Sequence, residues 1–260
     1  MSNPAQPEQR PAQIHIQALT ESRQFNQCVE LQDLVWGYDL SAMMTQKVFL
    51  LASQIGGQVL GAFDGDKLVG YAMSLPGIRN GHAYLHSHHL AVAPGYRNYG
   101  VGRRLKLAQR DDAIARGIDL MEWTFDPLEI KNSYLNFAKL GAISRRYKRD
   151  FYGTSSSPLH GGLPTDRIFA EWWLNSDRVR RILAGETPHT EATGQVDVPA
   201  ELAQWKTSNA DRPRALAVQA ANASALESAF ASGLSVIGYE LSPQGDGRFL
   251  LGVWDEPHGY

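Results

Sequence analysis

A strand that runs directly into a glycine-rich loop and a helix constrains this 260-residue chain more than any other feature. Residues 83–92 are predicted as a strand, and residues 101–116 contain strong helix formers. The connection between them contains Arg97, Gly100 and Gly102. Such a loop directs backbone N–H groups and the positive end of a helix to one point, as in pyrophosphate sites. The sequence therefore predicts a phosphate-binding loop.

Two common kinds of phosphate loop do not fit these residues. A Walker-type loop needs Gly-Lys-Ser/Thr, and the dinucleotide fingerprint needs three glycines near the first strand of a parallel unit. Neither pattern is present here. Glycine-rich turns before helices are also common as purely structural features, so the surrounding elements must decide the function of this one.

The hydrophobic pattern around the loop predicts a mixed α/β fold with one sheet. Strands are expected at 14–19, 59–63, 67–74, 120–125, 144–152 and 167–174, and helices at 21–36, 46–54 and 132–139. Thr20 is expected to cap the first helix. Further strands are expected at 215–218, 235–241 and 249–254, with a helix at 222–232.

Changes in composition along the chain predict four regions. Residues 1–12 form a loose polar tail, and residues 13–175 form the main α/β domain. Residues 176–198 form a helix and a linker, because Gly, Pro and Thr replace apolar residues over 184–195. Residues 199–260 form a small C-terminal βαββ extension.

Composition also narrows the functional classes. The net charge of −2 argues against nucleic acid as the main partner. No apolar run approaches the roughly 18 residues that span a bilayer, so no membrane partner is expected. The single cysteine, Cys28, excludes an intrachain disulfide and is expected in the core. It suits a reducing compartment, and a cytoplasmic location is expected.

The residues Leu90-Ala91-Val92-x-Pro94-x-x-Arg97-x-x-Gly100-x-Gly102-x-x-Leu105 resemble the acyl-CoA signature of the GNAT (GCN5-related) N-acyltransferase superfamily. The element order predicted from Ile14 to about Leu174 is similar to the order of that fold. The resemblance implies the GNAT fold, an acyl-CoA co-substrate and direct transfer of the acyl group to an amine.

Three further segments, residues 85–88, 122–128 and 162–167, resemble a GNAT subfamily with a C-terminal extension. Some members are linked to N-acylamino acid racemase or o-succinylbenzoate synthase-like enzymes, and N-succinylation of amino acids is attributed to them. The resemblance thus implies acetyl-CoA or succinyl-CoA as donor, and a small amine such as an amino acid as acceptor.

The family's CoA-binding residues can be carried over onto matching positions. Ala91 lies between Leu90 and Val92, whose backbone groups the resemblance assigns to the pantetheine arm. The pyrophosphate is assigned to Arg97, Asn98, Tyr99, Gly100, Val101, Gly102 and Arg103. For one of Arg103 and Arg104, a solvated helix face is the alternative. Asn132 matches the family's CoA-contacting asparagine at a shorter spacing, and Asn136 is a possible substitute.

A histidine pair precedes the loop. His86 and His88 are two residues apart on the predicted strand and should share one face, with His89 on the other. Imidazole suits a base that works near neutral pH, and the amine is expected to lose its proton through His88 and perhaps His86. Paired histidines at similar positions in arylalkylamine N-acetyltransferases are assigned to proton removal through water. The alternative is a pair of hydrogen-bonded wall histidines, and no metal is expected because further ligands are not evident.

The chain departs from the family at the group that protonates the leaving thiolate. Many GNAT enzymes have a tyrosine four residues before the helix-ending glycine, but here Phe137 precedes Gly141. Tyr134, Tyr147 and Tyr152 are either replacements or ordinary packed aromatics. A thiolate can also leave unassisted, because the reference thiol pKa is about 8.5.

If acceptor or donor carries a carboxylate, an arginine should hold it in bidentate geometry. Arg167 is the first candidate, with Arg145 and Arg149 as rivals, and a salt bridge of Arg167 with Asp166 or Glu171 is the alternative. Strand aromatics are mostly core, but Phe125 is a candidate for an apolar acceptor pocket.

The sequence leaves two functions open. One is an acyl-CoA-dependent N-acyltransferase. The other is a non-catalytic acyl-CoA-binding module that engages a partner through its C-terminal extension. A homodimer is a further expectation, because the extension must cover an exposed sheet edge or build an interface.

Overall fold

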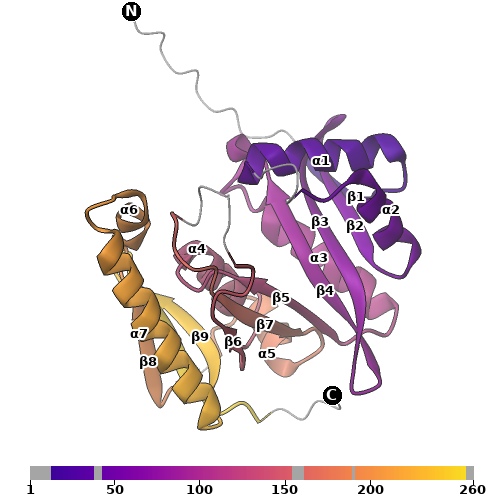
Figure 1. Cartoon of the computed structure of the whole chain (residues 1–260). Helices are drawn as coiled ribbons and strands as arrows, with labels where there is room; N and C mark the ends of the chain where they lie inside the picture. The colour runs from indigo at the N-terminus through magenta and orange to yellow at the C-terminus, as the bar shows by residue number, and fades with distance from the viewer. Residues whose placement is uncertain (1–12, 38–42, 154–160, 189–190, 256–260) are drawn as a thin grey trace, which may run out of the picture. The chain divides into compact units, whose positions relative to one another are not determined.

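The structure, a computed structural model, describes residues 13–37, 43–153, 161–188 and 191–255 (Figure 1). The tail predicted over residues 1–12 lies outside the described residues. The chain forms two compact units, one from residues 1–76 and 87–112 and the other from 77–86 and 113–260. Strands β3 and β4 each contribute residues to both units.

The first unit contains, in chain order, β1 (Ile14–Ala18), α1 (Ser22–Trp36), α2 (Gln46–Gln54), β2 (Gln58–Asp64), most of β3 (Lys67–Arg79), the second half of β4 (His82–Val92), the short 3₁₀ helix η2 (Pro94–Tyr96) and α3 (Val101–Ala115). Its strands lie in the order β1-β2-β3-β4. The helix α1 begins at a capping box of Glu21 and Gln24, so the predicted cap at Thr20 is wrong by one residue.

Helices cover both faces of the first unit's strands because successive strand residues point to opposite sides (Figure 1). On one face, α1 and α2 bury Phe25, Cys28 and Phe49. On the other, α3 buries Val101 and Leu105. Burial raises the pKa of the Cys28 thiol to about 12, which confirms that this cysteine is a core residue.

A buried polar network joins α3 to β4 in the first unit. Lys106 is 2% exposed, and its Nζ donates to Ser87 Oγ at 2.7 Å. Ser87 Oγ in turn donates to Gln109 Oε1 at 3.0 Å. Burial holds the pKa of Lys106 well below its usual value, because the ammonium loses its hydration inside the protein.

The lowered pKa of Lys106 predicts a pH-dependent stability. The unfolded chain binds a proton at this lysine up to about pH 10.4, whereas the folded chain releases it at a lower pH. The free energy of unfolding should therefore rise with pH between the two pKa values. Lys106→Met should remove this slope and be the more stable protein at its acidic end, as measured by urea unfolding. Lys47→Met, an exposed change on α2, should keep the slope.

The second unit begins with the remaining ends of β3 and β4 and continues with β5 (Leu120–Phe125), α4 (Ile130–Ser133), the π-helical η3 (Tyr134–Lys139), β6 (Tyr147–Lys148), β7 (Arg167–Trp173), α5 (Asp177–Leu183), β8 (Gly194–Val198), α6 (Leu202–Thr207), α7 (Arg212–Ala231), β9 (Ser235–Leu241) and β10 (Gly247–Gly252). Its strands lie in the orders β4-β5-β7-β6 and β8-β10-β9. This arrangement confirms the predicted mixed α/β class.

Register within the second unit fixes which side chains meet. The strands β4 and β5 pair in parallel, with Leu85 opposite Met121 and His86 opposite Glu122. The strands β5 and β7 are antiparallel, and Glu122 lies opposite Glu171. An isolated β-bridge between Val236 of β9 and Ser144 connects the C-terminal sheet to the segment before β6.

Three predicted elements differ from the structure. Residues 215–218 lie inside α7 and not in a strand, because Ala and Leu continue the helix and Pro213 occupies its tolerant first turn. The strand predicted over 144–152 is reduced to Tyr147–Lys148. Strand β8 begins at Gly194, inside the stretch predicted as a linker.

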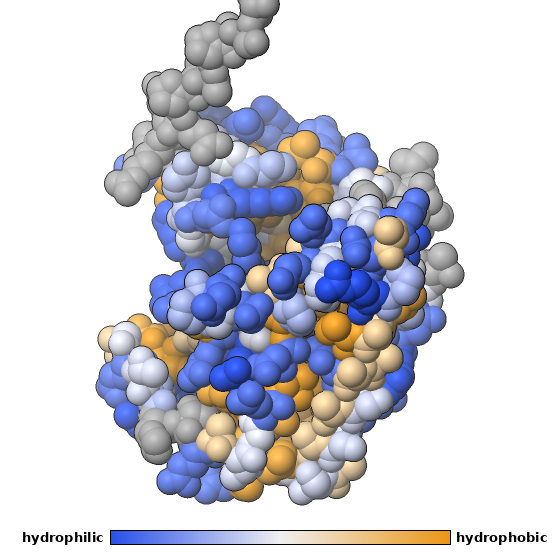
Figure 2. All heavy atoms as spheres, turned by 90° about the vertical axis from the view of Figure 1, so that its left-hand side faces the viewer, coloured by the Kyte–Doolittle hydropathy of each residue, from blue (hydrophilic) through white to orange (hydrophobic). Residues whose placement is uncertain are grey.

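The C-terminal elements are anchored within the second unit by a buried lysine. Lys206 Nζ lies 2.8 Å from Asp126 Oδ2 and 2.9 Å from Glu129 Oε1, which ties α6 to the segment after β5. Figure 2 views the side where α6, α7 and β8 lie, and blue polar residues are mixed there with pale-orange ones. No helix in the described part of the chain is long and apolar enough to cross a bilayer.

Candidate active site

The sheet of the second unit has one apolar and one polar face. Met121, Trp123 and Phe125 of β5 are buried on the apolar face. Glu122 and Thr124 alternate with them and project to the other side. Glu171 and Phe169 of β7 lie directly opposite these two residues in the ladder and share their side. We call this side the polar face.

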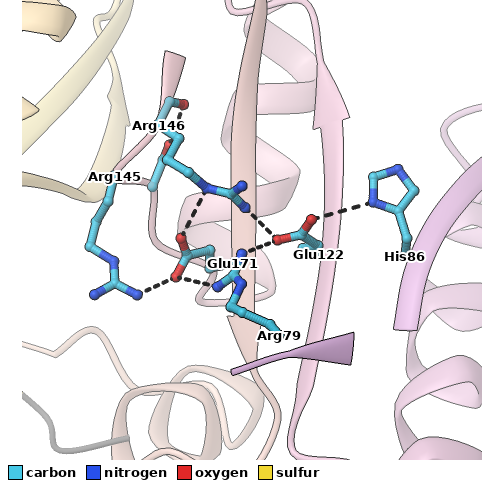
Figure 3. Close-up of polar contacts among 7 residues, drawn as sticks. Arg79, His86, Glu122, Arg145, Arg146 and Glu171 are labelled. Carbon is cyan, nitrogen blue, oxygen red and sulfur yellow. Dashed lines mark hydrogen bonds and ion pairs between the residues drawn. The ribbon is translucent and has the colours of Figure 1, made fainter. Parts of the chain in front are cut away.

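Six ionisable side chains form a charged cluster on the polar face (Figure 3). They come from the end of β3, from β4, β5 and β7, and from the segment before β6, and they are Arg79, His86, Glu122, Arg145, Arg146 and Glu171. The two carboxylates are almost fully buried, with 5% and 2% of their side chains exposed. Buried charges require partners, and the three arginines supply them.

Glu122 occupies the centre of the charged cluster. Both Arg79 and Arg146 donate to its Oε2. Its Oε1 lies 3.6 Å from His86 Nδ1. Burial alone would raise the pKa of Glu122, but the contact with His86 and the charges of Arg146 and Arg79 outweigh it and hold this pKa below its usual value. Glu122 is therefore ionised at neutral pH.

Glu171 is the second carboxylate of the cluster. Arg145 donates to its Oε2 at 2.5 Å, and Arg146 Nε lies 3.6 Å from its Oε1. Arg146 thus reaches between both carboxylates, as Figure 3 shows, and its guanidinium lies 4.4 Å from the centre of the Phe169 ring. Three arginines facing two glutamates leave the cluster with an excess positive charge, and Arg145 and Arg146 are 44% and 42% exposed.

The contact of His86 with Glu122 places an imidazole beside a carboxylate, an arrangement that can serve as a base and its orienting group. A carboxylate beside Nδ1 holds the imidazole in one orientation and stabilises the imidazolium that forms when Nε2 takes a proton. The His86 side chain is 25% exposed. In the described part of the chain, no group of three His, Cys, Asp or Glu side chains is arranged to hold a metal ion.

The histidines after His86 do not alternate as predicted. His88 is exposed, and its ring stacks on that of His89 with centroids 4.7 Å apart and planes 13° apart, so the two rings lie side by side. Tyr71 Oη lies 3.1 Å from His89 Nδ1. Burial and the adjacent His88 lower the pKa of His89 to about 3, which keeps it neutral.

The predicted phosphate loop follows β4 in the first unit. Asn98 and Gly100 both have left-handed backbones, with φ of 67° and 75°. At Gly100 this conformation favours glycine, and the position is open to solvent. Arg97, Asn98 and Tyr99 are exposed, and α3 begins immediately after them at Val101. The first N–H groups of a helix have no partner within it, so the loop fits an anionic group.

The residues that flank the loop differ in their burial and contacts. Leu90 and Val92 pack with the α3 core, whereas Ala91 is buried on the opposite face. Arg104 is exposed on α3, and its Nη2 donates to the carbonyl oxygen of Ile14 in β1. Arg103 is half-buried beside Gly102 in the first turn of α3.

Phe137 is fully buried and belongs to an aromatic core. Its ring centroid lies 5.8 Å from that of Phe125, 6.5 Å from that of Tyr239 and 5.9 Å from that of Phe249. Phe125 therefore packs on the apolar face and does not contribute to the charged cluster, contrary to its predicted place in an acceptor pocket. The C-terminal sheet seals the position where many relatives of the resembled family carry their acid.

The two candidate asparagines lie on either side of the change from α to π helix. Asn132 is exposed on α4, whereas Asn136 is buried in η3. Among the tyrosines considered as the acid, Tyr147 donates to Asp166 Oδ2 at 2.7 Å, and burial and this carboxylate raise its pKa strongly. Tyr134 lies under the Lys139 ammonium at 5.1 Å.

Arg167 and its two rivals bind different groups in the structure. Arg167 is 8% exposed, and its Nη1 donates to the backbone oxygen of Asp166 at 2.7 Å. Its guanidinium lies 5.1 Å from the centre of the Tyr152 ring. Arg145 binds Glu171, and Arg149 binds Glu227 of α7.

Sequence reasoning missed Arg79, Glu122, Arg146 and Glu171 as members of a site. The available signal was a single glutamate in the middle of each of two apolar strands, LMEWTF and RIFAEWW. A buried carboxylate at such a position needs a charged partner, which is a reason to search for nearby arginines.

Comparison with known proteins bears on the family and the fold. Residues 25–141 match the sequence model of the acetyltransferase (GNAT) family. The ribosomal-protein-S18-alanine N-acetyltransferase of Escherichia coli is 17% identical, with a TM-score of 0.50 over 63% of this chain and 96% of that one. The search of curated proteins found no match.

Two further solved structures share the fold. A protein described as a GNAT-family acetyltransferase from Desulfovibrio desulfuricans is 14% identical, with a TM-score of 0.50 over 62% of this chain and 99% of that one. The yncA protein of Salmonella typhimurium, solved with acetyl-CoA, is 16% identical, with a TM-score of 0.50 over 64% and 96%. Residues 25–141 therefore match the GNAT acetyltransferase family, and the predicted resemblance to that family, its fold and the enzyme class are confirmed.

Proposed function

We propose that this protein transfers an acetyl or succinyl group from acyl-CoA directly to the amine of a small molecule such as an amino acid. The observation that carries the proposal is His86, which lies beside the ionised Glu122 in the charged cluster. His86 stands on the same strand that leads into the phosphate loop. One strand thus carries both the base and the approach to the donor site.

Donor binding is assigned to the loop and the end of β4. The loop from Arg97 to Arg103, with the left-handed Gly100 and the start of α3, fits the pyrophosphate of acyl-CoA. The backbone of Leu90 and Val92 is assigned to the pantetheine arm, which would pair as an added strand. Asn136 is buried among packed residues, so the exposed Asn132 is the better candidate for a donor contact.

The reaction is a direct acyl transfer. His86 takes a proton from the acceptor's ammonium group, and the freed amine attacks the thioester carbon. A C–N bond forms and the C–S bond breaks, with the electron pair leaving on sulfur. His86, which is 25% exposed, passes the first proton to solvent and then takes the second proton, which the attacking nitrogen loses as the amide forms. The thiolate leaves without a protein acid, since thiols have a reference pKa of about 8.5.

The excess positive charge of the cluster supports a substrate with a carboxylate. Arg145 and Arg146 each bind a glutamate, yet both remain nearly half exposed, and each guanidinium has more N–H donors than these contacts use. A planar guanidinium suits bidentate binding of a carboxylate. This carboxylate would belong to an amino acid acceptor or to a succinyl group.

The test is thiol release by the purified protein from acetyl-CoA and, separately, from succinyl-CoA. Each donor is supplied with pooled D- and L-amino acids or with aromatic amines, and amine-free reactions are the controls. Release that depends on the amine would establish acyl transfer, and the donor that works would identify the acyl group.

Phe137 favours a second candidate, a non-catalytic acyl-CoA-binding module whose C-terminal part engages a partner. Calorimetry with CoA separates the two functions. CoA binding with no thiol release from either donor would contradict the enzymatic proposal and support the binding module.

A further inference from the structure

Two large aromatic side chains are exposed at the edge of the polar face. Phe151 is 44% exposed and Tyr152 is 51% exposed. Tyr152 Oη lies 3.1 Å from Thr124 Oγ1, and the Phe151 ring lies 5.6 Å from the ring of Phe169. Contiguous exposed apolar surface marks interaction sites and ligand-binding grooves. These two therefore extend the polar face beside the charged cluster with an apolar surface.

Hydrogen bonds join the residues around these aromatics to residues 165 and 166. The backbone N–H of Asp150 donates to Asp166 Oδ1 at 2.9 Å, and the N–H of Thr165 donates to Asp150 Oδ1 at 3.1 Å. The N–H of Tyr152 donates to Thr165 Oγ1 at 3.0 Å. Residues 149–153 and 164–167 therefore form two joined legs of one loop.

Helix α7 binds both legs of this loop. Arg149 Nη2 donates to Glu227 Oε2 at 2.7 Å, and its Nε lies 3.1 Å from both oxygens of the same carboxylate. On the other leg, the buried Gln219 donates from Nε2 to the Pro164 carbonyl at 2.8 Å. Gln219 and Glu227 are eight residues apart, or about 12 Å along the helix. The helix thus clamps the loop at two separated points.

We propose that the acceptor carries an aromatic or branched apolar group that packs on Phe151 and Tyr152, and that α7 positions this surface through Gln219 and Glu227. The inference rests on the proposed acyl transfer, because it places the apolar group beside His86 and the charged cluster. A surface fixed in advance binds a ligand with less loss of conformational entropy. Phe151 and Tyr152 are the contacting residues, and Glu227 is a positioning residue.

The first experiment compares phenylalanine, as separate D and L forms, with glycine as acceptors. Both have the same amine and carboxylate, so they differ only in the apolar group. The parent protein should prefer phenylalanine in kcat/KM, and the double variant Phe151→Ala, Tyr152→Ala should lose this preference by about tenfold or more. An unchanged preference in the double variant, or no preference in the parent, would overturn the inference.

The second experiment tests the clamp. Glu227→Gln should raise KM for phenylalanine more than it changes kcat, and Glu227→Asp should restore part of the loss. The matched control is Glu186→Gln, which removes a similar exposed ion pair with Arg181 at 2.7 Å and should leave the preference unchanged. A Glu227→Gln protein with the parent's KM would contradict the positioning role.

A binding measurement separates the two proposals. Calorimetry of phenylalanine and glycine with the parent and the double variant reports the apolar contact without turnover. Tighter binding of phenylalanine that is lost in the double variant, together with no thiol release, would support the apolar surface and contradict acyl transfer. Equal binding of both amino acids to the parent, together with thiol release, would contradict the apolar surface alone.

Discussion

His86→Ala should lower kcat by about 100-fold to 1,000-fold while leaving the affinity for CoA unchanged. The imidazole beside Glu122 is assigned as the proton acceptor for the amine, whereas donor binding is assigned to the loop after β4. Steady-state thiol release gives kcat, and calorimetry with CoA gives the dissociation constant. A loss of CoA binding would show that the change acts through the fold of β4.

Two further histidine variants test which histidine is the base. His82→Ala, an exposed change on the same strand, should keep the parent's kcat. His88→Ala should have a smaller effect than His86→Ala, because His88 is exposed and stacks on the neutral His89. If His88→Ala abolishes turnover and His86→Ala does not, then His88 is the base.

Glu122→Gln should lower the free energy of unfolding by about 2 to 3 kcal/mol. The carboxylate is almost fully buried and accepts from both Arg79 and Arg146, so its loss leaves two guanidinium groups facing a neutral amide. This loss of unfolding free energy is small for a buried ion pair, because Arg146 is partly exposed. The variant should also lose activity, because His86 loses the group that orients it.

Urea unfolding of Glu122→Gln measures this change, with Glu186→Gln as the exposed control. The control should lie within about 0.5 kcal/mol of the parent, as is usual for surface ion pairs. Glu122 is held ionised by its neighbours, so the parent should also lose stability as the pH falls through the lowered pKa of this group. A Glu122→Gln protein as stable as the parent would contradict the assigned role of the cluster.

The local features of this fold could be predicted from the sequence. Each predicted strand and helix of the first unit lies within a few residues of its observed place, because alternation and glycine boundaries act over short distances. The turn at Gly100 was predictable for the same reason, since a left-handed residue between a strand and a helix favours glycine.

The charged cluster could not be predicted from local patterns, because it depends on which strands pair and in which register. Arg79, Glu122 and Glu171 are far apart in the chain and meet only because β5 pairs with both β4 and β7. Periodicity assigns each glutamate to a face but does not say which strand lies beside it. The stacking of His88 on His89 was also beyond prediction, because it requires a departure from strand alternation.

The aromatic surroundings of Phe137 bear on the donor in the proposed acyl transfer. A side chain without a hydroxyl, enclosed by Phe125, Tyr239 and Phe249, supplies no proton to a departing group. A thiolate can leave without a proton donor, because it is stable near neutral pH. An alkoxide leaves poorly without one, since its conjugate acid has a pKa closer to that of water, about 15.7. Phe137 cannot act as the acid for a leaving group, so the proposed reaction suits thioester donors better than oxygen esters with the same acyl group.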